Sequence, residues 1–71
     1  MASGFGRLIS AHAIYEGMFI RGVANGYGRI IFSNEEYYEG TFQDAKFNGL
    51  GQYVYNNGTI EKGTWENGVF E

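Results

Sequence analysis

The stretch "YYEGTFQDAKFNGLG" at residues 37–51 resembles another stretch of the same chain, "IYEGMFIRGVANGYG" at residues 14–28. With an offset of 23 residues, 15–37 and 38–60 share eight identical positions. These are Tyr15/Tyr38, Glu16/Glu39, Gly17/Gly40, Phe19/Phe42, Asn25/Asn48, Gly26/Gly49, Gly28/Gly51 and Asn34/Asn57. A period of about 20 to 50 residues is typical of stacked structural units that share one core. The sequence therefore predicts a repeat array.

Partial copies flank the two full ones. A third copy starts at residue 61, keeps Gly63 and Trp65, and is half complete at Glu71. At the other end, Gly4-Phe5-Gly6 matches the Gly-aromatic-Gly pattern of residues 26–28. We therefore divide the single predicted domain, 1–71, into a half repeat at 4–14, full repeats at 15–37 and 38–60, and a half repeat at 61–71.

Length and composition limit how such a domain can be stabilised. A chain of 71 residues buries only about 60% of its unfolded surface, so its stability is expected to be marginal. It has no Cys and one His, which excludes a disulfide framework and a structural zinc site of Cys and His ligands. Oligomerisation or docking into a host assembly remains as the compensating device.

Charge argues against several classes of partner. Five basic and eight acidic residues give a net charge of −3, whereas a nucleic-acid surface needs clustered Lys and Arg. The apolar runs are too short to span a bilayer, and Met1-Ala2-Ser3 does not begin a signal peptide. We expect a cytoplasmic or cytoskeleton-associated protein that is neither secreted nor transmembrane and that binds no nucleic acid.

Alternating apolar positions predict strands instead of helices. The strands are expected near residues 5–10, 14–20, 27–33, 37–43, 50–55 and 59–65. The turns are expected near Arg21–Asn25, Asn34–Glu36, Asp44–Asn48 and Asn56–Gly58. Asn-Gly pairs, which tolerate positive φ, support the hairpins.

The glycines of these strands are predicted to be packing positions. The expected register places Phe19 opposite Gly28, Phe42 opposite Gly51 and Gly40 opposite Tyr53. A ring can then lie flat over bare backbone, and such cross-strand pairs contribute about 0.2–1 kcal/mol each. The structural glycines are Gly17, Gly28, Gly40, Gly51 and Gly63.

The alternation assigns side chains to two faces, and both are candidate partner-binding surfaces. The first is an aromatic groove of Tyr15, Phe19, Phe32, Tyr38, Phe42, Tyr53, Tyr55 and Trp65. The second face is polar in its C-terminal half, while its N-terminal half carries Ile9, Met18, Ile20, Tyr27 and Ile31. Contiguous exposed apolar surface often marks an interaction site.

The segments "YEGMFIRGVANGYG" and "YEGTFQDAKFNGLG" resemble the MORN repeat (membrane occupation and recognition nexus). The resemblance implies an all-β fold, a single elongated twisted antiparallel sheet of consecutive hairpins. Asn25 and Asn48 depart from the family's usual His before Gly, and Ala45 replaces a loop Gly. It also implies a scaffold role in cytoskeletal, ciliary or organellar assemblies, and phospholipid binding has been proposed for the family.

No residue pattern indicates catalysis, a metal or a cofactor. The Gly-x-Gly elements at 26–28 and 49–51 lack the helix and Lys of a phosphate-binding loop. His12 and the pair Glu35-Glu36 are most simply solvated turn residues. We therefore expect a protein that is not an enzyme.

Three functional hypotheses remain. The leading one is a protein-interaction or self-associating module that uses the aromatic groove or the open sheet ends. The alternative is a phospholipid- or membrane-targeting module, although the five cations are dispersed. Because the array starts and stops within a repeat, the chain could also be a piece of a larger MORN-containing enzyme.

Overall fold

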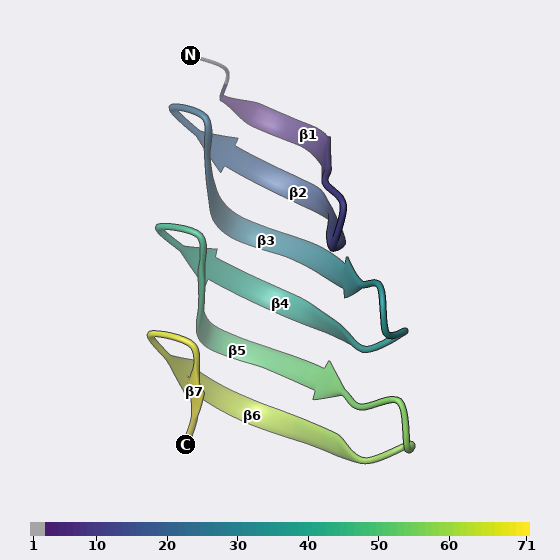
Figure 1. Ribbon diagram of the computed structural model, residues 1–71. Helices are drawn as coiled ribbons and strands as arrows, with labels where there is room; N and C mark the ends of the chain where they lie inside the picture. The colour runs from purple at the N-terminus through teal and green to yellow at the C-terminus, as the bar shows by residue number, and fades with distance from the viewer. Residues whose placement is uncertain (1–2) are drawn as a thin grey trace.

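A computed structural model describes residues 3–71 as a single open antiparallel sheet. Met1 and Ala2, on which the signal-peptide argument partly rests, lie outside the described residues. Strands follow one another in chain order across the sheet, as Figure 1 shows. They are β1 (Gly4–Ile9), β2 (Ala13–Ile20), β3 (Val23–Phe32), β4 (Tyr37–Gln43), β5 (Lys46–Val54), β6 (Ile60–Glu66) and β7 (Val69–Phe70). The predicted all-β hairpin array is confirmed, with seven strands where about six were expected.

The hairpin turns are shorter than predicted. We expected turns through Arg21–Asn25 and Asp44–Asn48, but the chain reverses within Arg21-Gly22 and Asp44-Ala45. A third turn of this kind lies at Asn67-Gly68. All six of these residues have positive φ, between 51° and 85°, which is the geometry of a type I′ turn. The Asn-Gly pairs at 25–26 and 48–49 therefore lie inside strands.

The shorter turns also change the strand register. Gly17 pairs with Gly28, not with a residue two further along, and Gly40 pairs with Gly51 where Tyr53 was expected. Bulges that include Gly26 and Gly49, with φ of 91° and 93°, absorb the extra residues. Because side chains alternate with a period of two, a shift of two residues leaves every side chain on its predicted face.

Six glycines consequently form a continuous row across the sheet. Each is the register partner of the next, in the order Gly6, Gly17, Gly28, Gly40, Gly51 and Gly63. We expected each glycine to face a large side chain directly opposite, and this was wrong. The rings instead reach the glycines diagonally from neighbouring positions.

Two tyrosines lie over this glycine row. The Tyr15 hydroxyl donates to the Met18 carbonyl at 2.7 Å, and the Tyr38 hydroxyl donates to the Thr41 carbonyl at 2.9 Å. A Cβ on Gly28 would lie only 2.6 Å from the Tyr15 hydroxyl oxygen. A Cβ on Gly51 would meet the Tyr38 ring in the same way. The idea that rings pack on bare backbone is therefore confirmed, but with different pairs.

The core lies on one face of the sheet, which we call the aromatic face. Tyr15, Tyr38, Phe42 and Trp65 are buried there, and Tyr38 is fully buried. Partly buried neighbours complete the cluster: Phe19, Ala24, Ile30, Phe47, Tyr53 and Phe70. Within the described chain no second layer covers these rings, so they bury one another.

Side-chain amides tie each repeat to the next. The Asn25 side-chain oxygen accepts the Asp44 backbone N–H at 3.1 Å, and Asn48 accepts that of Asn67 at 3.4 Å. Asn25 and Asn48 occupy the positions that depart from the family pattern. Each therefore satisfies a backbone donor in the turn of the following unit.

Glu36 has a structural role that the sequence did not reveal. We expected Glu35-Glu36 to be a solvated turn, yet the Glu36 carboxylate accepts the Tyr53 hydroxyl at 2.9 Å and the Asn56 backbone N–H at 3.3 Å. These bonds lower the pKa of Glu36, the Tyr53 hydrogen bond being the largest cause. Glu36 thus connects the loop between β3 and β4 to the loop between β5 and β6.

Candidate functional site

The eight residues predicted to form the aromatic groove all contribute to one aromatic surface. Four of them are the buried core, and Phe19 and Tyr53 are half-buried beside it. Phe32 stacks against Tyr53 with ring centroids 6.1 Å apart. Tyr55 lies 4.6 Å from the Tyr53 ring and donates its hydroxyl to Glu61 at 2.7 Å. The whole set is contiguous from β2 to β6.

Two important aromatic residues were missed by the sequence reasoning. Phe47 stacks on Tyr38 with centroids 3.9 Å apart and planes 6° from parallel. Phe70 packs against Trp65 at 5.0 Å. Both lay in regions that we assigned to a turn or left unassigned. The signal was present in the period, because residues 24, 47 and 70 are 23 apart and all apolar.

A cavity of about 300 Å³ opens on the aromatic face in the first repeat. Nine residues line it and none is charged. Its walls include Tyr15, Phe19, Ile30 and Phe42, and Ala24 lies among them. In the second repeat Phe47 occupies the corresponding place, stacked on Tyr38.

The opposite face, which we call the charged face, carries a central row of polar residues. Its members are successive register partners: Arg7, Glu16, Arg29, Glu39, Gln52 and Lys62. The signs alternate over the first four. The Arg7 Nε lies 3.2 Å from a Glu16 carboxylate oxygen, and the Tyr27 hydroxyl donates to Glu39 at 3.1 Å. Opposite-charge cross-strand neighbours of this kind stabilise a sheet modestly.

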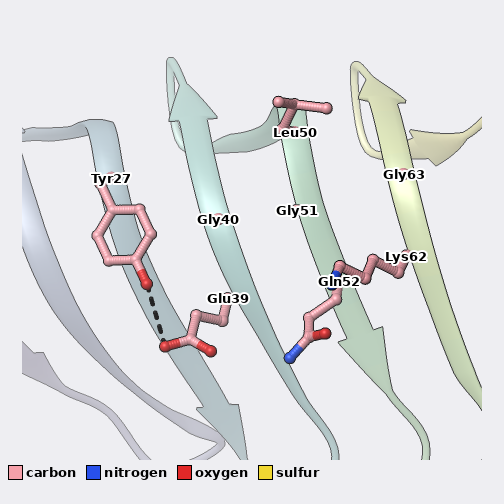
Figure 2. A pocket seen from close by; sticks show the side chains of 8 residues that line it. All are labelled: Tyr27, Glu39, Gly40, Leu50, Gly51, Gln52, Lys62 and Gly63. Carbon is pink, nitrogen blue, oxygen red and sulfur yellow. Dashed lines mark hydrogen bonds between the residues drawn. The ribbon is translucent and has the colours of Figure 1, made fainter.

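An open depression of about 410 Å³ lies on the charged face over β3 to β6. Figure 2 shows Tyr27, Glu39, Gln52 and Lys62 projecting from four neighbouring strands, with Leu50 at one end. The floor includes Gly40, Gly51 and Gly63 of the glycine row. The depression combines the carboxylate of Glu39, the ammonium of Lys62 and the amide of Gln52 with apolar groups. These polar groups do not converge on a single point.

The predicted apolar patch on this second face is larger than expected. Ile9 is 65% exposed, Met18, Ile20 and Tyr27 are also exposed, and Ile31 is half-buried. Two of its residues, Ile9 and Ile31, belong to a row of successive register partners that crosses six strands: Ile9, Ile14, Ile31, Tyr37, Val54 and Ile60. The apolar surface of the second face therefore continues into the C-terminal half.

The titratable groups on the aromatic face favour packing over acid–base chemistry. Desolvation raises the pKa of Tyr53 to about 12, and the hydrogen bond to Glu36 adds to the effect. Burial also raises the pKa of Tyr15 and Tyr38. These hydroxyls are committed to carbonyl or carboxylate acceptors.

Within residues 3–71, no group of three or more His, Asp and Glu side chains is arranged to hold a metal ion. That part of the chain also contains no helix with the length and apolarity needed to cross a membrane.

Comparison with known proteins agrees with the hairpin repeat. No curated protein sequence matches the chain. A family model described as MORN repeat matches residues 15–36 and 38–60, which together are more than half of the chain. The matched segments coincide with the two full copies that share the Tyr-Glu-Gly strand, the Asn-Gly bulge and the glycine row. The chain belongs to the MORN-repeat family.

Proposed function

We propose that this protein is a non-catalytic interaction module that holds a segment of a partner protein against its aromatic face. One observation carries the proposal: the aromatic core is one face of a single sheet, and no layer of the described chain covers it. Secondary structure with an apolar face is stable when another element covers that face. A partner segment would supply the missing layer.

The physical case rests on how little core the chain has. Only four hydrophobic residues of the described chain are buried, and rings packed against them, such as Phe19, Tyr53 and Phe70, are only partly buried. Exposed contiguous apolar surface is typical of interaction sites. The Tyr, Phe and Trp residues of the aromatic face are also types enriched in the binding cores of interfaces. A scaffold subunit in a cytoskeletal, ciliary or organellar assembly in the cytoplasm would use the surface in this way.

Anionic lipid is the weaker candidate. Arg7 and Arg29 alternate with Glu16 and Glu39 in the row of the charged face. A polybasic segment gains about 1 kcal/mol per cation near an anionic membrane, but interleaved carboxylates offset that gain. Sedimentation with phosphatidylserine vesicles at physiological salt tests this alternative, and salt-resistant binding would favour it over a protein partner.

Site-specific photocrosslinking in the native cell tests the proposal. A photoreactive phenylalanine analogue replaces Leu8, an exposed residue that lines the aromatic-face cavity and pairs with Tyr15, and in a second variant replaces Leu50 on the charged face. We expect a discrete crosslinked protein from position 8 and none, or a different one, from position 50.

Size-exclusion chromatography with light scattering supplies the control for self-association. A crosslink of the chain to itself, together with a dimer in solution, would identify a second copy as the covering layer. An equal crosslinking pattern from both positions, or no crosslink from position 8, would contradict the proposal.

A further inference from the structure

The first repeat contains the walls of an aromatic stacking site but not its ring. In the second repeat Phe47 lies flat on Tyr38. Phe42 and Trp65 lie edge-on to Phe47, with ring centroids 5.7 and 5.5 Å from its own. Tyr53, 6.0 Å away, closes the far side. The residues 23 positions before Tyr38, Phe42, Trp65 and Tyr53 are, in that order, Tyr15, Phe19, Phe42 and Ile30. All four line the cavity of about 300 Å³.

The cage geometry is the same in both repeats. The ring centroids of Tyr38 and Phe42 are 5.2 Å apart with an interplanar angle of 82°, and those of Tyr15 and Phe19 are 5.1 Å apart at 84°. The centroids of Tyr38 and Trp65 are 5.4 Å apart with an interplanar angle of 87°, and those of Tyr15 and Phe42 are 5.1 Å apart at 87°. The aromatic walls around Tyr15 are therefore placed as they are around the site that Phe47 fills.

The backbone at residue 24 is also equivalent to that at residue 47. The Ala24 carbonyl accepts the Ala45 N–H at 2.9 Å, and the Phe47 carbonyl accepts the Gly68 N–H at 2.9 Å. Ala24 pairs with Phe19 as Phe47 pairs with Phe42. The two positions differ only in the side chain that they carry, a methyl group in one and a benzyl group in the other.

We infer that the cavity at Ala24 is a slot for one aromatic side chain of the partner segment, which takes the place that Phe47 fills in the second repeat. This inference rests on the proposed function and specifies the chemistry of the partner: a phenylalanine-like ring stacked towards Tyr15. The protein itself provides the template, because it shows which group fits between these walls.

Charge and size both fit an uncharged ring. None of the residues lining the slot is charged, so a lysine or a carboxylate would lose its hydration without a counter-ion. An apolar cavity of about 150 Å³ is large enough to bind benzene, and this slot exceeds that volume. Tyr15 retains 5% exposure, against 0% for Tyr38 beneath Phe47, while the walls Phe19 and Ile30 are only partly buried. The ring would cover those remaining surfaces.

Titration of the free chain with N-acetyl-L-phenylalaninamide, followed by methyl NMR at Leu8 and Ile30, tests the slot directly. We expect saturable shifts with a dissociation constant on the order of 1 mM, which is reasonable for so small a ligand. N-acetyl-L-alaninamide and N-acetyl-L-lysinamide serve as control probes. They are expected to cause at least tenfold weaker effects at equal concentration.

Two reciprocal variants make the test specific. Ala24→Phe supplies the ring from the chain itself and should weaken binding of the probe at least tenfold. Phe47→Ala should open a second slot, seen as new shifts around Tyr38. If Ala24→Phe does not fold, Ala24→Leu fills part of the slot and should weaken binding of the probe by a smaller factor.

The outcomes separate this inference from the proposed function. Unchanged binding of the probe by the folded Ala24→Phe variant overturns the slot. So does the absence of shifts in the wild-type chain when the probe concentration is 20-fold above the expected dissociation constant of about 1 mM. A partner that crosslinks at position 8 but binds the Ala24→Phe variant as tightly as the wild type also overturns it and leaves the interaction module intact. Shifts that Ala24→Phe abolishes, with no protein crosslinked at position 8, support the slot and remove the proposed function.

Discussion

The two full repeats, 15–37 and 38–60, have the same backbone and differently filled interiors. The second repeat places Phe47 and Tyr53 on the aromatic face, while the first has Ala24 and Ile30 at the same positions. The Tyr, Gly and Asn residues of the glycine row, the bulge and the inter-repeat bond are identical in both. The comparison shows that the shared residues specify the geometry, and the variable inward residues decide how much of it is closed to a ligand.

Both repeats have a strand on each side, but the outer neighbour of the second repeat contributes an aromatic ring to its core. Phe47 contacts rings from β4 and β6, and Trp65 of β6 donates its indole N–H to the Gly51 carbonyl at 3.1 Å. The first repeat has only β1 beyond it, and β1 contributes Leu8 to the cavity in place of a ring. Stability should therefore be concentrated at 38–66.

Removing the central ring of the second repeat should have the largest effect. Phe47→Ala gives the second repeat the alanine that the first has at position 24 and leaves Tyr38 without its stacked partner. Truncation of buried Phe costs about 3–5 kcal/mol, and because Phe47 is partly exposed we expect roughly 3 kcal/mol. Urea unfolding followed by tryptophan fluorescence measures the loss.

Phe5→Ala is the matched control, since Phe5 is 75% exposed and lies on the other face. It should change the free energy of unfolding by no more than about 0.5 kcal/mol. Equal losses from both substitutions would mean that the two regions do not differ as described.

A methyl group in the centre of the glycine row should have the next largest effect. In Gly51→Ala the new Cβ would lie within 2.8 Å of the Tyr38 ring, so the fully buried ring must move. Overpacking of this kind costs about 1–3 kcal/mol. Thermal unfolding followed by circular dichroism measures the shift.

Gly6→Ala tests the same row at its edge. There the Cβ meets only the end of the Phe19 ring, at 3.1 Å, and Phe19 is partly exposed and can rotate. The loss should be well below that of Gly51→Ala. If Gly6→Ala is the more damaging variant, the core does not lie where the rings indicate.

A substitution in the turn of the second repeat should stabilise the protein. Ala45 has φ of 65°, a conformation that an L-residue with a Cβ disfavours by about 1–2 kcal/mol. Ala45→Gly matches the Gly22 and Gly68 of the other turns and should gain about 0.5–1 kcal/mol after the entropy of glycine is subtracted. The reverse change, Gly22→Ala, is the control and should lose a similar amount in the same urea experiment.

The fold class could be predicted from the sequence because the period and the alternation carry it. The 23-residue repeat and the apolar alternation predicted six of the seven strands and the correct face for each ring of the proposed groove. Face assignment survived the register error because the shift was two residues, and a shift of one would have inverted it.

Two of the four predicted turns were misplaced because composition favours the wrong pair. Asn25-Gly26 and Asn48-Gly49 are the usual type I′ dipeptides, yet the chain reverses at Arg21-Gly22 and Asp44-Ala45. The Asn side chains are needed for the inter-repeat bonds to Asp44 and Asn67, which are long-range contacts with no local signal. Placing residues 44–48 in a turn then hid Phe47, the residue that distinguishes the two repeats.

A high-pH measurement should reveal the smallest difference between the repeats. Tyr53 in the second repeat has a pKa raised to about 12 by desolvation, whereas Ile30, its counterpart in the first, does not titrate. Below pH 10 Tyr53 is protonated in both states and its contribution to stability is complete. Between pH 10 and about 12 the unfolded chain loses the proton while the folded chain retains it, so the free energy of unfolding falls as pH rises.

We expect Tyr53→Phe to be less stable than wild type at pH 8, through the lost bond to Glu36, and to lose less additional stability than wild type between pH 10 and 12. Parallel slopes for the two proteins in that window would show that Tyr53 is not shielded by the packing of the second repeat.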